Sequence, residues 1–197
     1  MTKIIDNFNE KLYYALCNEF LDKDEIAIAS AYFNIKGYGS LRAGLADKPL
    51  LFLLGREPTE SIKWEEEVLR ELEENEDDLK YFRLLQDVIA YFSDTKRQIR
   101  IAKGPFFHGK AYIGSSPSLR EVKNGVGVVG SSNFTYGGLV SNRELNMLNT
   151  DREAIIDLSN WFLEQWNKSE DFKENFISFL KNYVTTRSPY EVIAKAL

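Results

Sequence analysis

Several features are scarce in this 197-residue chain, and each scarcity excludes a class of protein. The single cysteine, Cys17, rules out a disulfide framework, so a reducing cytoplasm is the simplest setting. The longest apolar runs, such as residues 49–54, are far shorter than the roughly 20 residues that cross a bilayer. The first residues lack the basic and then apolar pattern of a signal peptide. We therefore expect a soluble cytoplasmic protein.

The bulk composition indicates one globular domain. The chain is 44% hydrophobic and 13% aromatic, which is enough apolar material for a sizeable core. We assign this domain to residues 1–184. Residues 185–197 become weakly helical again after Pro189 and end without a capping residue. We expect them to form a tail, or a linker to a further domain in a longer native protein.

Charge is distributed unevenly along the chain, which has a formal net charge of −5. Nine of the residues from 65 to 78 are acidic, whereas residues 96–123 contain seven cations and a single acid, Glu121. The basic segment surrounds the only histidine, so it could steer an anionic substrate towards that residue. Both charged segments could also be merely solvated surfaces.

The hydrophobic periodicity predicts alternating helices and strands early in the chain and clustered strands in its middle. Asp6 or Asn7 can cap a first helix, which carries Leu12, Leu16 and Phe20 on one face. Strands are expected at 25–33, 49–55, 97–101, 107–113, 126–130 and 144–148. Further helices are expected at 40–45, at 64–92 with a break at 75–78, at 152–167 and at 169–184, with loops at 34–40 and 114–125. This pattern predicts an α/β fold with a central mixed sheet flanked by helices.

Three polar motifs occur together in the middle of the chain, next to apolar segments. They are His108-x-Lys110, Gly130-Ser131-x-Asn133 and Asn142-x-Glu144. Residues two apart in a strand project from the same face, so His108 would point with Lys110, and Ser131 with Asn133. An ammonium and an amide can hold the charged oxygens of a phosphodiester while an imidazole nitrogen attacks its phosphorus. The motifs thus predict phosphodiester chemistry.

These motifs resemble the signature of the phospholipase D superfamily, in which His-x-Lys is followed by an aspartate, by Gly-Ser-x-Asn and by a downstream glutamate. The match covers the middle third of the chain. The strand end at 32–34 and the two C-terminal helices are similar to a nuclease-like, helicase-associated branch with one motif per chain. The resemblance implies a phospholipase D-like fold with its active site at a homodimer interface.

The resemblance also implies a mechanism that needs no metal or other cofactor. His108 would form a phosphohistidine intermediate, and a second histidine would protonate the leaving oxygen and then activate water. Lys110, Ser131 and Asn133 would bind the phosphate, and Glu144 would hold the other ring nitrogen of His108. Because this chain has one histidine, the second must come from another subunit. The implied catalytic residues are His108, Lys110, Asn133 and Glu144, acting in a homodimer.

The expected substrate is DNA, and the expected partner is a fused or associated helicase. The nuclease-like branch, the basic segment and the absence of lipid-facing features favour this interpretation. Tyr136 follows the Asn133 motif in a glycine-rich loop and could touch the substrate.

One position departs from the family pattern, and two alternatives remain open. Ser115 stands where the family has its aspartate, five residues after Lys110. The chain could be a catalytically idle DNA-binding or targeting module of the same fold, which the missing aspartate and the acidic net charge favour. It could instead be a phospholipase or phosphatidyl-transferase, for which Phe106 and Phe107 offer apolar side chains near His108.

Overall fold

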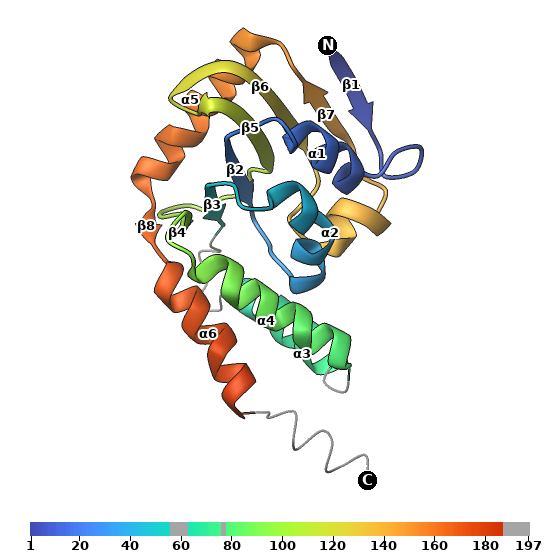
Figure 1. Cartoon of the computed structure of the whole chain (residues 1–197), viewed down its shortest axis with the longest axis vertical. Coiled ribbons are helices and arrows are strands. Elements are labelled where there is room, and N and C mark those ends of the chain that lie inside the picture. Colours follow the sequence, from blue (N-terminus) through green and yellow to red (C-terminus); the bar gives the residue numbers. More distant parts are fainter. Residues whose placement is uncertain (56–62, 76–77, 187–197) are drawn as a thin grey trace.

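The computed structural model describes residues 1–55, 63–75 and 78–186, which form a mixed eight-stranded sheet flanked by helices (Figure 1). The strand order is β1-β7-β6-β5-β2-β3-β4-β8. The strands are β1 (Thr2–Ile5), β2 (Glu25–Ser30), β3 (Leu50–Leu54), β4 (Arg97–Ile101), β5 (Ala111–Ser118), β6 (Glu121–Gly130), β7 (Asn146–Asn149) and β8 (Glu170–Asp171). β2, β3 and β4 are parallel, and the other neighbouring pairs are antiparallel. The predicted α/β fold is confirmed.

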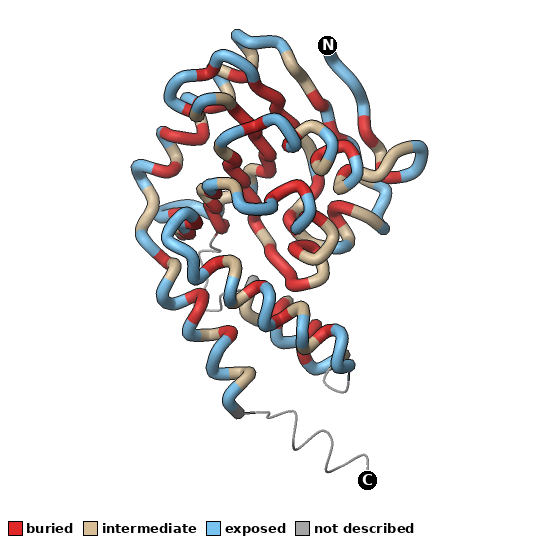
Figure 2. The backbone as a smooth tube through the Cα atoms, viewed as in Figure 1, coloured by how far each residue is buried: buried red, intermediate tan, exposed pale blue. Residues whose placement is uncertain are grey.

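Helices cover both faces of the sheet. They are α1 (Leu12–Phe20), α2 (Ile35–Leu45), α3 (Lys63–Glu74), α4 (Leu79–Ser93), α5 (Arg152–Lys168) and α6 (Lys173–Thr186). α1, α2, α4 and α6 share one core with the sheet, in which the ring of Phe33 contacts Phe92 and Phe134 edge-to-face at centroid distances of 6.1 and 5.3 Å. α5 packs in a second core (Figures 1 and 2). Two cores on one sheet require strands that are apolar on both sides.

β2 meets that requirement through its alternation of large and small apolar residues. Ile26 and Ile28 belong to the core under α1 and α2, whereas Ala27 and Ala29 belong to the core under α5. Successive side chains of a strand point to opposite faces, so one apolar segment serves both cores. The predicted burial of this strand on both faces is confirmed, although the strand ends at Ser30 rather than at 33.

The loop predicted at 34–40 is wrong, because α2 already begins at Ile35. Asn34 caps the helix, and its Oδ1 accepts a hydrogen bond of 2.8 Å from Gly37 N. Gly37 permits close packing rather than a turn, since a Cβ there would lie 2.7 Å from Thr135 Cα. α2 therefore rests directly on the chain that follows the Asn133 motif.

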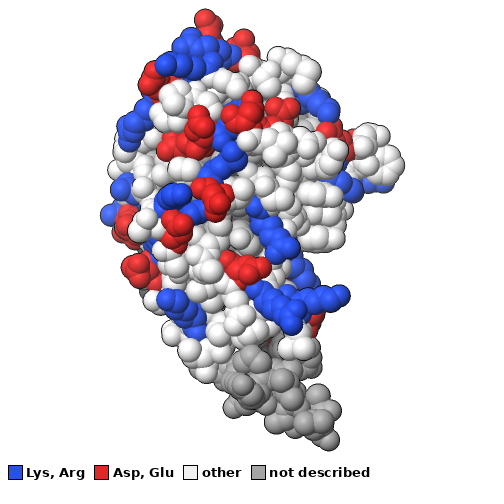
Figure 3. Space-filling model, in the orientation of Figure 1, with Lys and Arg blue, Asp and Glu red and all other residues white. Residues whose placement is uncertain are grey.

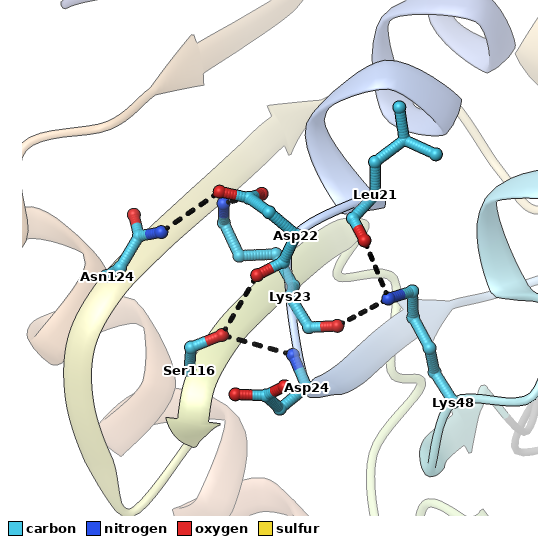
Figure 4. Close-up of polar contacts among 7 residues, drawn as sticks. All are labelled: Leu21, Asp22, Lys23, Asp24, Lys48, Ser116 and Asn124. Carbon is cyan, nitrogen blue, oxygen red and sulfur yellow. Dashed lines mark hydrogen bonds and ion pairs between the residues drawn. The ribbon is translucent and has the colours of Figure 1, made fainter.

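The loop predicted at 114–125 is also wrong, because β5 and β6 continue through it as a hairpin. A polar cluster surrounds this end of the hairpin (Figure 4). Lys48 Nζ donates to Leu21 O and Lys23 O at 3.0 and 2.6 Å, and Ser116 Oγ donates to Asp22 O at 3.2 Å. We call this the hairpin end of the sheet; its polar groups mainly tie one backbone segment to another.

Most other predicted elements are present with shifted boundaries. The helical stretch predicted at 64–92 is divided into α3 and α4, and its break includes residues 76–77, which lie outside the described part. The short edge strands β1 and β8 were not predicted, and β5 and β7 begin at Ala111 and Asn146, later than expected. The first helix begins at Leu12, whose N donates to Asn7 Oδ1 at 2.8 Å. Most of the tail predicted at 185–197 is outside the described residues, and its role stays a prediction.

Candidate active site

The strand register brings the three polar motifs to one edge of the sheet. Ala29 at the end of β2 pairs with Ala111 at the start of β5, and Ala111 pairs with Val129 near the end of β6. Gly130 then pairs with Asn146 at the start of β7. We call this edge, formed by the ends of β2 and β6 and the starts of β5 and β7, the motif edge. It also receives the carboxyl ends of the parallel strands β3 and β4, a usual place for sites in α/β proteins.

His108 and Lys110 lie in an extended segment just before β5, not in the strand itself as predicted. Lys110 is buried, and its Nζ donates to His108 O at 2.9 Å. The side chain of His108 is exposed, and its ring lies against Phe106 with a centroid distance of 5.0 Å. Gly55, at the end of β3, lets this segment approach, since a Cβ there would lie 2.5 Å from Phe107 O.

The ammonium of Lys110 sits in a desolvated position. Burial lowers the pKa of Lys110 below that of an ordinary lysine, and the negative charge of Glu144 offsets part of this change. A buried cation is unfavourable unless a negative group compensates it. The motif edge thus holds the positive charge of Lys110 within the electrostatic influence of Glu144, which lies in the connection between β6 and β7. A bound anion would stabilise this charge further.

Ser131 and Glu144 are brought together although they lie thirteen residues apart. Glu144 lies outside the strand expected at 144–148, because β7 begins at Asn146, whereas Ser131 directly follows β6, which ends at Gly130 as expected. Ser131 Oγ donates to Glu144 Oε2 and accepts a hydrogen bond of 3.0 Å from Leu145 N. This pair fixes the carboxylate beside Lys110. The role expected for Glu144, holding the imidazole, stays a prediction.

Asn133 is held at the same edge by Ser30, at the end of β2. Ser30 Oγ accepts from Phe134 N at 2.8 Å, donates to Tyr32 O at 2.6 Å and lies 3.3 Å from Asn133 Oδ1. This contact orients the amide nitrogen of Asn133 away from Ser30. Gly138 packs against the backbone of Asn133, where a Cβ would lie 2.3 Å from its carbonyl oxygen. The sequence analysis included Ser30 only as part of the strand at 25–33. The feature that could have indicated its role is its position, since it is the polar residue that ends an apolar run.

Two further residues that the sequence analysis did not single out support this corner. Asn34 Oδ1 accepts a second hydrogen bond, of 2.9 Å, from Tyr136 N. The carboxylate of Glu71 accepts from Ile35 N and Lys36 N at 2.7 and 2.9 Å. Burial raises the pKa of Glu71, while these two bonds act in the opposite direction. At least this member of the acidic segment is not a solvated surface residue.

Ser115, at the position of the family aspartate, lies away from the motif edge. It is fully buried in β5, and its Oγ donates to Ser118 O at 2.8 Å. Five residues of strand separate it from Lys110, roughly 17 Å at the usual rise. The departure from the family pattern therefore changes a position near the hairpin end and removes no group from the motif edge.

The cations of residues 96–123 do not form the basic approach that the sequence suggested. Arg97 pairs with Asp94 at 2.6 Å, and the guanidinium of Arg100 lies over the ring of Trp166 at 5.0 Å. Lys123 pairs with Glu121 at 2.9 Å in the hairpin. Figure 3 accordingly shows positive and negative side chains interspersed over much of the visible face. Lys103, just after the carboxyl end of β4, pairs with Glu170 at 3.1 Å, whereas Lys110 is buried at the motif edge.

Solved structures of other proteins share this fold. NucT from Helicobacter pylori is similar with a TM-score of 0.59 and 13% identity, over 87% of this chain and 99% of that one. Nuc from Salmonella typhimurium, a phospholipase D family member, gives 0.56 and 11%, over 87% and 97%. Phosphatidylserine synthase from Haemophilus influenzae gives 0.53 and 14%, over 94% of this chain and 45% of that one. No curated protein sequence matches the chain significantly.

These likenesses define an α/β protein of the phospholipase D-like fold, and a sequence match defines the family. The profile described as "Cardiolipin synthase, PLD-like domain" matches residues 68–166, about half of the chain, including all three motifs. The chain belongs to the phospholipase D superfamily. The resemblance stated from the motifs is confirmed at this level, whereas its helicase-associated branch stays a prediction. In the described residues, no helix is both long and apolar enough to span a membrane.

Proposed function

We propose that the protein is a metal-independent phosphodiesterase, and specifically a DNA nuclease, in which His108 is the nucleophile. One observation carries the proposal: the buried ammonium of Lys110 bonds the backbone carbonyl of His108, whose side chain is exposed, at the same edge as the Ser131–Glu144 pair and Asn133. A desolvated cation and an amide donor next to an imidazole are suited to bind and attack a phosphodiester.

In the proposed reaction, an imidazole nitrogen of His108 attacks phosphorus while the bond to the leaving oxygen breaks. A second imidazole gives its proton to that oxygen and then takes a proton from water, whose oxygen attacks phosphorus and releases His108. Lys110 and the amide of Asn133 hold the non-bridging oxygens, and Ser131 joins them as a donor when its hydroxyl turns away from Glu144, to which it donates in this structure. Because one chain has one histidine, the second imidazole belongs to His108 of a second copy.

An exposed apolar surface next to the motif edge supports pairing of two copies. Val129, Met147 and Ile4 are neighbours across β6, β7 and β1, and they are 49, 50 and 55% exposed. Leu145, which follows Glu144, is 65% exposed. A contiguous apolar patch of this kind marks a docking surface in a soluble protein. A second copy is the occupant that would also supply the missing imidazole, so we propose a homodimer with a shared site.

Hydrolysis of a small chromogenic phosphodiester in excess EDTA tests the proposal. Wild type is expected to turn over, and His108→Ala is expected to lose at least about 10³-fold in rate because the nucleophile is gone. Thermal unfolding of both proteins serves as the folding control. Absence of EDTA-resistant turnover would leave the idle DNA-binding module as the better account, and turnover that survives His108→Ala would remove His108 from its role.

A phospholipase or phosphatidyl-transferase is the second candidate. Phe106 is 37% exposed and lies against the ring of His108, which favours an apolar leaving group. Phosphatidylserine synthase shares the fold. A competition experiment distinguishes the two candidate functions. If the protein is a nuclease, an oligonucleotide should inhibit hydrolysis of the small diester more strongly than phospholipid vesicles do at equal phosphate concentration.

A further inference from the structure

A basic groove lies between α2 and α4, beside the motif edge. It has a volume of about 500 Å³ and contains four cations and one carboxylate, Asp87. The cations are Lys36, Arg42, Lys80 and Arg83. Figure 3 shows blue side chains gathered at the lower right, over α2 and the first part of α4, in a chain with a net charge of −5. Like charges are grouped here although the protein as a whole is acidic.

Two of the four cations bond to neighbouring side chains, and the other two form no ion pair within the described ranges. Arg42 forms an exposed ion pair with Asp87 at 3.2 Å, and Lys36 Nζ donates to Asn75 Oδ1 at 2.8 Å. Lys80 and Arg83 are exposed, and neither forms an ion pair with any residue in the described ranges. Two adjacent turns of α4 thus present positive charge to the groove, and that charge is available to an external anion.

The groove adjoins the residues proposed to hold the scissile phosphate. Tyr136, which lines it, follows Asn133 by three residues, so their Cα atoms are at most about 11 Å apart. Lys36, which also lines it, lies in the first turn of α2, two residues after Asn34, and Asn34 Oδ1 accepts a hydrogen bond from Tyr136 N. The groove therefore begins next to the segment that carries Asn133.

We propose that this groove binds the phosphate backbone of the nucleic acid that enters the site, on the side away from the scissile bond. The proposal rests on the proposed nuclease function and extends it to a particular surface. Lys80 and Arg83 contact backbone phosphates, and Lys36 lines the same groove. The ring of Tyr136, 43% exposed at the near side of the groove, offers a face on which a base stacks. Contacts of this kind position a strand without reading its sequence.

The test compares a groove variant with a charge-matched control. The groove variant is Lys80→Ala with Arg83→Ala. The control is Lys123→Ala with Lys168→Ala, two exposed lysines that pair with Glu121 and Glu164 outside the groove. All four side chains are exposed, so both variants should keep the thermal stability of the parent protein.

Binding is measured on the full chain carrying His108→Ala, by fluorescence anisotropy of a single-stranded oligonucleotide of about 20 nucleotides. The groove variant should bind at least about ten-fold more weakly at low salt, and its slope of log K against log salt should fall by about 1.4, which corresponds to two lost phosphate contacts. The control should match the parent. Equal affinity of groove variant and parent, an equal loss in the control, or no oligonucleotide binding by the parent would overturn the proposal.

A second readout separates this inference from the nuclease proposal. With His108 intact, the groove variant should lose at least about ten-fold in kcat/KM for the oligonucleotide relative to a small diester, because only the long substrate reaches the groove. If wild type cleaves neither substrate, the nuclease proposal fails, but the anisotropy experiment still tests whether the groove binds nucleic acid. Loss of binding to phosphatidylglycerol vesicles, with oligonucleotide binding unchanged, would reassign the groove to a lipid surface.

Discussion

The two ends of β5 carry polar clusters that differ in how their charges are satisfied. At the hairpin end, Lys48 donates to two backbone carbonyls and Asn124 donates to Asp22 at 3.2 Å (Figure 4). At the motif edge, Lys110 is buried with a lowered pKa beside a carboxylate, and His108 is exposed. Lys110 also donates to one backbone carbonyl, that of His108, so bonds of this kind do not by themselves distinguish the two ends. The motif edge differs because it combines a buried ammonium of lowered pKa with an exposed histidine in the same short segment, an arrangement suited to a ligand.

After His108→Ala, the largest expected effect is the loss of activity in Lys110→Met. Removing the charge that would hold the non-bridging oxygens should lower kcat/KM for a small diester by about 10²–10³-fold. Stability should be unchanged or slightly higher, since an apolar side chain replaces a desolvated ammonium. Steady-state kinetics and thermal unfolding measure the two effects. A variant that keeps its activity would place phosphate binding elsewhere.

Asn133→Asp should have the next largest effect. The substitution preserves shape and leaves an oxygen facing Ser30 Oγ, but it puts a negative charge where the phosphate is proposed to bind. We expect a loss of about 10²-fold in kcat/KM with a nearly unchanged melting temperature. Asn124→Asp, at the hairpin end, is the matched control and should keep full activity. Equal losses in the two variants would remove the distinction between the two ends.

The activity should have an alkaline limb set by Lys110. Burial lowers the pKa of this lysine, so its ammonium is lost as pH rises through a value below the ordinary one of about 10.4. Activity should therefore fall several-fold on that limb. Between this lowered pKa and the ordinary pKa of the unfolded chain, Lys110 has lost its proton in the folded protein but keeps it in the unfolded chain. A rise in pH through this range therefore stabilises the folded protein, while the activity falls. Both trends are checked by measuring kcat/KM and the melting temperature against pH, in wild type and, for the melting temperature, in Lys110→Met. The prediction would be contradicted if activity and the contribution of Lys110 to stability fell together as pH rises.

Lys48→Met should have the smallest effect on chemistry. The side chain donates two hydrogen bonds to backbone carbonyls at the hairpin end, so its loss should lower the free energy of unfolding by about 1–2 kcal/mol. Turnover should be unchanged, because the hairpin end and the motif edge lie at opposite ends of β5. Urea unfolding and the diester assay together provide the comparison with Lys110→Met. An activity loss as large as that of Lys110→Met would contradict the account.

The sequence was informative where the determinants are local. His108-x-Lys110 and Gly130-Ser131-x-Asn133 are short motifs, and the mixed sheet follows from apolar periodicity. Ser30, Asn34 and Glu71 could not be assigned roles, because only tertiary structure brings them beside Asn133 or the start of α2. The hairpin at 114–125 was misread because glycine, serine and proline indicate a loop, whereas pairing with β2 and β6 keeps the segment extended.

The cations of residues 96–123 show a related limit. Their proximity in sequence suggested a single basic surface, yet Arg97 is buried in β4 and paired with Asp94, whereas Lys123 lies in the hairpin and is paired with Glu121. The cations that do gather, Lys36, Lys80 and Arg83 among them, come from two helices and are separated by an acidic segment in the sequence. Charge clusters on a folded surface depend on packing, which linear spacing does not reveal.

The most direct test of the central claim is an activity measurement on mixtures of wild-type and His108→Ala chains, unfolded and refolded together. If two copies of His108 form one site, specific activity should follow the square of the wild-type fraction and reach about one quarter of the wild-type value in an equal mixture. A linear dependence, with about one half of the activity at that point, would show that each chain works alone and would contradict a shared site.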